Sequence, residues 1–121
     1  MSARATHTQP EADIPDRART EGPFSAVFHE AAELVGRRWT GAILYALAHG
    51  IQRFSELEVA IPGLSARLLT ERLRELEGVN VVERVLQEGG TRRSYRLTAK
   101  GEALRPVLIA LNHWAVAWSD R

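Results

Sequence analysis

Residues 64–97 read LSARLLTERLRELEGVNVVERVLQEGGTRRSYRL. The first part of this stretch predicts a helix, because Leu69, Leu73 and Leu76 recur at helical spacing and form one apolar face. Ser65 comes directly after a Pro-Gly pair, where its hydroxyl can cap the first turn of the helix. The helix must therefore bury its leucine face and leave the polar face free.

The polar face of this helix carries side chains that suit nucleic acid. Arg67, Thr70, Glu71 and Arg74 project from one side near the helix start, as the residues of a recognition helix do in the major groove. Glu71 can accept a hydrogen bond from a cytosine amino group, or it can brace Arg67 and Arg74 within the helix. Both interpretations of Glu71 stay open.

The second part of the stretch predicts a two-stranded hairpin. Its turn, EGGT at residues 88–91, contains paired glycines, which permit a tight reversal. Arg92 and Arg93 follow the turn, where a projecting wing would reach the DNA phosphates. A solvated hairpin that is merely rich in arginine is the alternative, but the helix beside it favours the wing.

Helical periodicity continues on both sides of this stretch. It predicts helices at about 24–35, 39–47 and 54–60, and the last of these is separated from the leucine helix by Pro62 and Gly63. A short helix, a turn and a capped helix form the helix-turn-helix layout. A long final helix at 99–118 follows the hairpin, and Pro106 should bend it or loosen one turn.

The fold class that follows is mostly α with a small β-hairpin wing (α+β), a winged helix-turn-helix. Residues 1–22 are expected to be a flexible N-terminal arm, because they have almost no periodic hydrophobicity. Residues 23–121 then form one DNA-binding domain, with dimerisation helices at about 24–35 and 99–118.

The first and last helices have more apolar surface than one small domain can cover. Packing them against their copies in a second chain would form a dimer interface, with these residues in it: Phe24, Phe28, Leu111, Trp114 and Trp118. A symmetric dimer would also place two recognition helices one DNA turn apart, which suits an inverted repeat. The alternative is that both helices wrap their own domain.

Charge and composition exclude several classes of protein. The net charge is only +1, so bulk charge does not argue for nucleic acid, although residues 65–97 contain seven arginines against five glutamates. The chain contains no cysteine, which excludes disulfides and thiolate metal sites. It has no apolar run of membrane-spanning length and no signal-peptide core, so no membrane association and a cytoplasmic location are expected.

Enzyme chemistry is not expected either. The sequence has no phosphate-binding glycine loop and no nucleophile elbow, so we expect no enzyme and no cofactor. His29 and Glu33 have a spacing that could share a metal, but two ligands do not make a site, and no metal is expected.

Aromatic side chains could instead line an effector pocket where the end helices meet the winged domain. Such a cavity suits a small aromatic effector, and the residues expected to line it are His29, Trp39, Tyr45, His113 and Trp114. Plain packing of a hydrophobic core is the alternative for the same residues.

Several motifs together resemble one known family, the HxlR-type winged helix-turn-helix transcription regulators. The motifs are GRRW (36–39), RFSEL (53–57), IPGLS (61–65), LTERLREL (69–76), RSYRLT (93–98), Gly101, LRP (104–106) and Trp114. The resemblance implies a bacterial, homodimeric, sequence-specific DNA-binding protein that represses or activates a nearby operon. The residues then expected at the DNA are Ser65, Ala66, Arg67, Thr70, Glu71, Arg74, Arg92 and Arg93.

The sequence departs from the family pattern in two places. Members often carry a Cys-Pro pair before the first helix, but this chain has Gly22 and Pro23 there, so thiol sensing is excluded and any effector must bind noncovalently. The link EGVNVV at 77–82 also lacks the usual acidic-glycine-leucine order. A different class of function stays open as well: the near-neutral charge would suit a winged-helix interaction module that has lost DNA binding.

Overall fold

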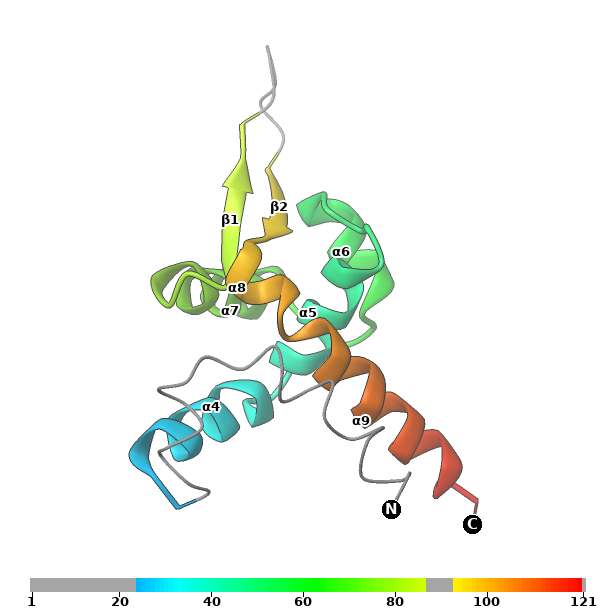
Figure 1. The fold of residues 1–121 in the computed structure, drawn as a ribbon. Coiled ribbons are helices and arrows are strands. Elements are labelled where there is room, and N and C mark those ends of the chain that lie inside the picture. Colours follow the sequence, from blue (N-terminus) through cyan, green and yellow to red (C-terminus); the bar gives the residue numbers. More distant parts are fainter. Residues whose placement is uncertain (1–23, 87–92, 121) are drawn as a thin grey trace. The chain divides into compact units, whose positions relative to one another are not determined.

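The computed structural model describes residues 24–86 and 93–120. The chain divides into two compact units, residues 1–36 and 37–121. The helices and strands, labelled in Figure 1, are α4 (Ala26–Gly36), α5 (Thr40–Ala48), α6 (Phe54–Ala60), α7 (Ala66–Gly78), β1 (Val82–Val85), β2 (Ser94–Leu97), α8 (Ala99–Glu102) and α9 (Arg105–Ala117). The structure is mostly helical with one small antiparallel sheet, which confirms the predicted fold class.

Helix α4 is the described part of the first unit, and it matches the helix expected at 24–35. The Ser25 hydroxyl accepts a hydrogen bond from the Phe28 amide at 3.1 Å, which caps the helix start. No residue of α4 is buried in the single chain. The predicted N-terminal arm lies outside the described residues.

The core of the second unit forms around α5. Ile43 and Leu44 of this helix are fully buried, as are Leu57 of α6 and Leu69 of α7. Helix α5 contacts α6, β2 and α9, so it lies at the centre of the unit. The unbroken apolar composition of α5 fits a helix that is covered on most sides.

The helix-turn-helix consists of α6, a short turn and α7. Gly63 in the turn has φ +89°, a left-handed conformation that glycine adopts without strain. Ser65 then caps α7 as predicted, since its hydroxyl accepts from the Leu68 amide at 3.1 Å. Buried Ile61 and Leu64 anchor the turn to the core.

The hairpin forms as expected, but its base includes a further segment. β1 and β2 pair antiparallel, with Val82 opposite Leu97. On the other side of β2, the Tyr95 amide donates to the Gln52 carbonyl and the Phe54 amide donates to the Arg93 carbonyl, each at 2.9 Å. The linker between α5 and α6 therefore forms an isolated antiparallel β-bridge, Arg53 to Ser94, that fixes the wing to the helix-turn-helix. The predicted turn at 88–91 lies outside the described residues.

The single final helix expected at 99–118 is two helices. α8 starts at Thr98, whose hydroxyl accepts from the Gly101 amide at 3.1 Å, and it ends at Glu102. Pro106 explains the break, because it cannot donate to the Glu102 carbonyl and its ring would clash there. Helix α9 starts anew at Arg105 and leads away from the hairpin (Figure 1).

Two cations, one on α8 and one on α9, donate to carbonyls at the C-terminal ends of earlier helices. The Arg105 guanidinium donates to the carbonyl of Ala48 at the end of α5, and Lys100 donates to the Val79 carbonyl at 2.8 Å. Cations at helix C-termini stabilise the unpaired carbonyls there. None of the described helices is both long and apolar enough to span a bilayer.

Gly101→Ala should unfold at markedly lower denaturant. A Cβ at this position would lie 2.2 Å from the Val81 carbonyl oxygen and 3.1 Å from the Leu97 Cβ. Because backbone and a buried strand would have to shift, we expect a loss of about 1 to 3 kcal/mol in the free energy of unfolding. Urea titration followed by circular dichroism measures this loss.

Gly78→Ala is the matched control. Nothing lies within 4 Å of a Cβ placed there. The control should gain up to about 1 kcal/mol from the better helix propensity of alanine. Equal stability of the two variants would contradict the close packing at Gly101.

Candidate nucleic-acid interface

The polar face of α7 is exposed in the second unit. Residues at the cap and on successive turns lie on this side of the helix, and all are exposed except the half-buried Thr70: Ser65, Ala66, Arg67, Thr70, Glu71 and Arg74. The opposite face is buried through Leu69, Leu73 and Leu76. The structure thus brings together the helix residues predicted to face DNA, and the other described residues of the second unit leave this side open.

Arg67 and Arg74 are the cations of this face. They lie two helical turns apart on the same side, and neither forms an ion pair with another described residue. Their guanidinium groups are therefore available to guanine edges or phosphates, the partners that arginine binds in a bidentate manner. Thr70 lies between them on the same side.

Arg72 has a different role from its neighbours, and the sequence analysis missed it. Its side chain is buried, and its Nε donates to the Arg38 carbonyl at 3.0 Å. Its Nη1 lies 3.4 Å from carboxylate oxygens of Glu71 and Glu75. Glu75 also pairs with Arg37 at 2.9 Å. This network ties α7 to the segment that precedes α5.

The position of Arg72 in the leucine pattern was the available signal. It precedes Leu73 and lies three residues after Leu69, at the edge of the apolar stripe. An arginine there must either turn outward or find buried acceptors. Glu71 contacts Arg72 at 3.4 Å, and not Arg67 or Arg74, the two arginines that it was expected to brace.

Arg93 lies at the base of the wing. Its Cζ is 3.7 Å from the centroid of the Phe54 ring, and its Nη2 is 3.5 Å from the Thr70 hydroxyl. A cation over an aromatic face is attracted by the ring quadrupole. Arg93 therefore links the wing, α6 and α7, a contact between three elements that spacing along the chain could not reveal. Arg92, the other predicted wing residue, lies outside the described residues.

The strands contribute further arginines that differ in their availability. Arg96 pairs across the strands with Glu83 at 2.7 Å, as expected for directly opposed residues. Arg84 is exposed and lies 5.8 Å from the Tyr95 ring centroid. Of these two, Arg84 is the one whose charge is not neutralised by a described partner.

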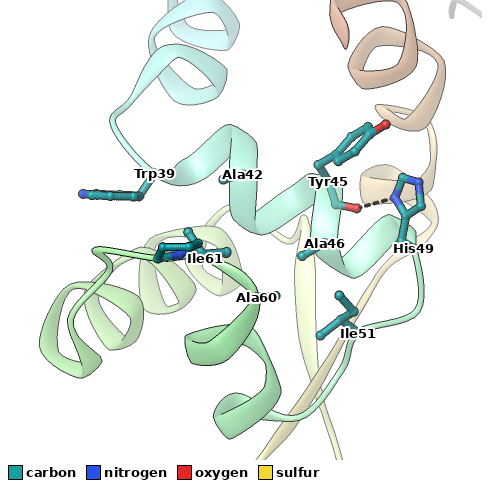
Figure 2. A pocket seen from close by; sticks show the side chains of 9 residues that line it. Trp39, Ala42, Tyr45, Ala46, His49, Ile51, Ala60 and Ile61 are labelled. Carbon is teal, nitrogen blue, oxygen red and sulfur yellow. Dashed lines mark hydrogen bonds between the residues drawn. The ribbon is translucent and has the colours of Figure 1, made fainter.

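The residues of the predicted effector pocket are distributed over both units. Trp39 and Tyr45 line a hollow between α5 and the end of α6 (Figure 2). His113 and Trp114 are exposed on α9 and do not line that hollow, and His29 belongs to α4 in the first unit. In the described part of the chain, no group of three or more His, Asp or Glu residues is placed to hold a metal ion.

The residues predicted for a dimer interface are exposed in the single chain. Phe24 and Phe28 lie at and near the start of α4. Leu111, Trp114 and Trp118 lie on α9 or at its C-terminal cap, and Trp114 has 63% of its surface exposed. Each of these side chains therefore leaves apolar surface without cover in its own unit.

Comparison with known proteins identifies the family. The model of the HxlR-like helix-turn-helix family matches residues 34–121. The chain belongs to this family. The HTH-type transcriptional regulator YvaP of Bacillus subtilis is 47% identical over 94 residues, which cover 77% of this chain and 87% of the relative.

Solved structures of a second HxlR relative agree with this assignment. The reduced form of the transcriptional regulator YodB from B. subtilis superposes with a TM-score of 0.69 at 40% identity, covering 78% of this chain and 94% of that one. A structure described as quinone-bound YodB gives a TM-score of 0.67 at 37% identity, covering 78% and 100%.

Together, the family and the exposed α7 identify this HxlR-like chain as a DNA-binding transcriptional regulator. The relatives YvaP and YodB are both named as HTH-type transcriptional regulators. The interaction module without DNA binding is not favoured, because relatives named as HTH-type regulators share the helix-turn-helix itself.

Arg72→Ala should destabilise the protein, whereas Arg74→Ala should not. Loss of the buried guanidinium leaves the Arg38 carbonyl without its donor and the Glu75 carboxylate with one cation fewer. We expect a loss of about 2 to 4 kcal/mol for Arg72→Ala and a change within about 0.5 kcal/mol for exposed Arg74→Ala. Urea unfolding of both variants measures these changes in the free energy of unfolding. An Arg72→Ala protein as stable as the wild type would show that this network contributes little to stability.

Proposed function

We propose that the chain acts as a homodimer that binds an inverted-repeat operator and places one α7 helix in the major groove of each half-site. The observation that supports this most directly is the face of α7 that presents exposed Arg67 and Arg74, with half-buried Thr70 between them, opposite a buried leucine face. A two-fold axis would set the two helices about 34 Å apart, one turn of DNA. Because the proposed ligand is DNA, we also propose that the protein acts in the cytoplasm.

The second chain is proposed from the surface of α9. Leu108 is its only buried residue, whereas Val107, Leu111, Trp114 and Val116 remain exposed around the helix. In a soluble protein, an exposed apolar surface such as that of α9 marks an interaction site. Covering each large side chain would contribute roughly 1.5 to 3 kcal/mol.

Helix α4 is the second element proposed for the dimer interface. It carries Phe28 and Val27 exposed, with Phe24 just before the helix start. A helix of eleven residues that buries none of them gains little stability by itself, because isolated helices of this length are marginal in water. A partner helix from the second copy would provide the missing apolar contact.

The wing is proposed to contact phosphates beside the groove. Arg84 lies exposed on β1, and Arg93 at the base of β2 has donors left beyond its contact with Thr70. Arg92 is proposed for the same role from its place in the sequence. Such contacts set the orientation of the protein on DNA without reading the base sequence.

A small aromatic effector is proposed to modulate DNA binding. The support is that a relative, YodB, has been solved in a quinone-bound form. This chain contains no cysteine, so its effector must be held by noncovalent contacts. Whether DNA binding represses or activates depends on where the operator lies relative to the promoter.

Arg67→Ala and Arg74→Ala should weaken operator binding. If each guanidinium reads a base, the loss should be about 1 to 3 kcal/mol for the specific site and much less for unrelated DNA. Fluorescence anisotropy with DNA from upstream of the gene, at two salt concentrations, measures both affinities. Lys100→Ala is the matched control. It also removes one positive charge, but from α8, where Lys100 lies beside the C-terminal end of α7.

The three variants distinguish an effect of the position of the arginines on α7 from an effect of the net charge of the protein. Equal losses for all of them would mean that only net charge matters, and the assignment of the α7 face would be wrong. Unchanged operator affinity for Arg67→Ala and Arg74→Ala would also contradict the proposal. In either case folding is verified by circular dichroism.

Trp114→Glu should convert the dimer to a monomer. Trp114 is 63% exposed in the single chain, so the change does not disturb the core. At a dimer interface, a buried unpaired carboxylate and a lost aromatic anchor should weaken association by about 2 kcal/mol or more. Sedimentation equilibrium over a range of concentrations measures the mass.

Val59→Glu is the control for this experiment. Val59 is 83% exposed on α6, and its replacement by glutamate should leave the dimer intact. A wild-type protein that sediments as one chain at micromolar concentration would overturn the homodimer. A Trp114→Glu protein that remains a dimer would remove α9 from the interface.

A further inference from the structure

We propose that the hollow between α5 and the end of α6 binds an uncharged, planar aromatic molecule, and that its occupation shifts α7 and so changes DNA affinity. The regulatory half of this inference rests on the proposed function, because DNA binding supplies its readout. The residues that carry the argument are Trp39, Ala42, Ala46, Ala60, Ile61 and Pro62.

The walls of the hollow define the chemistry of its ligand. Ala42, Ala46 and Ala60 are too small to fill the space between α5 and α6, which has a volume of about 590 Å³. This volume lies within the usual range for small-molecule sites, of roughly 300 to 1,000 Å³. Among the described residues, no Asp, Glu, Lys or Arg side chain lines the hollow, so a charged ligand would lose its hydration without gaining a partner from them.

Aromatic rings stand at two ends of the hollow. Figure 2 shows Trp39 on one side and Tyr45 with His49 on the other, with Ala46 and Ala60 between them. The His49 ring is held in place, because its Nδ1 donates to the Tyr45 carbonyl at 2.8 Å and its centroid lies 4.4 Å from that of the Tyr45 ring. Aromatic residues in the lining of a site favour a flat ligand that can stack or pack edge to face.

The conformation of Trp39 is the second observation. This residue has φ +78°, in the left-handed region that bulky side chains rarely adopt. Such strain costs of order 1 to 3 kcal/mol and persists only when the surroundings hold the residue in place. The indole is held between the Arg38 guanidinium, 5.0 Å from its centroid, and Gly63, where a Cβ would come within 3.3 Å of Cη2.

Two connections lead from the walls of the hollow to α7. Ile61 and Pro62 belong to the turn of the helix-turn-helix, and Gly63 in that turn packs against the Trp39 ring. The carbonyl of Arg38, next to Trp39, accepts the hydrogen bond from buried Arg72 of α7. A ligand that displaces the indole would therefore move both the turn before α7 and the Arg38 carbonyl that accepts from Arg72. For this shift, the ligand must bind the protein with the displaced indole more tightly than the protein without it.

Calorimetric titration of the full chain with three probes tests the site. Naphthol is flat and neutral, naphthoate has the same rings with a negative charge, and cyclohexanol is neutral but not flat. Naphthol should bind at least about tenfold more tightly than either of the others, a difference of about 1.4 kcal/mol. Absence of heat with naphthol up to millimolar concentration would overturn the inference.

Ala60→Leu tests the location of the site. Position 60 is exposed, so leucine enters the hollow without overfilling the core, and naphthol affinity should fall at least about tenfold. Ala99→Leu makes the same change at an exposed position of α8 and should leave naphthol affinity unchanged. Equal naphthol affinity of the Ala60→Leu and Ala99→Leu proteins would overturn the site. Naphthol binding to the monomeric Trp114→Glu protein alone would also overturn it, because a second copy would then cover the hollow in the dimer.

The coupling to DNA is tested by adding naphthol to the operator titration. We expect operator affinity to change at least about fivefold, and naphthol affinity to change by the same factor on DNA-bound protein, as linkage requires. Naphthol that binds without altering operator affinity would overturn the regulatory half. Failure of the proposed function would look different, because the protein would then show no sequence preference even without naphthol.

Discussion

The rest of the structure depends on the burial of one face of α7. Leu69, Leu73 and Leu76 are all removed from solvent, and each contributes roughly 1.5 to 3 kcal/mol. Because side chains three and four residues apart share a face, this burial also decides which residues remain outside. The free side of the helix, with Arg67 and Arg74, is thus a consequence of how the core is packed.

Polar contacts then fix the orientation that the leucines allow. Arg72 holds α7 to the start of α5 through the Arg38 carbonyl, and Arg93 holds it to the wing through Thr70 while stacking on Phe54. Neither arginine needs DNA for these contacts. A helix supported from two sides presents its outer face with little freedom, which lowers the entropy lost on binding.

Local patterns were enough to predict most elements, but contacts between elements were not. The leucine spacing and the cap at Ser65 predicted α7 correctly, since both signals act within a few residues. The break before α9 was expected only as a bend or a loosened turn, because the effect of a proline depends on how many turns precede it. The buried role of Arg72, the inward contact of Arg93 and the left-handed Trp39 all arise from residues distant in the chain.

The β-bridge between Arg53 and Ser94 at the base of the wing has a consequence for self-association. Strand edges with free amides and carbonyls invite pairing with another chain, and a two-stranded hairpin has two such edges. Here Gln52 and Arg53 cover the outer edge of β2 near its start, so intermolecular strand addition there would require the α5–α6 linker to detach. On β1, the exposed side chains of Glu83 and Arg84 place opposite charges along the strand, so a second copy could add to it only in a register that matches them.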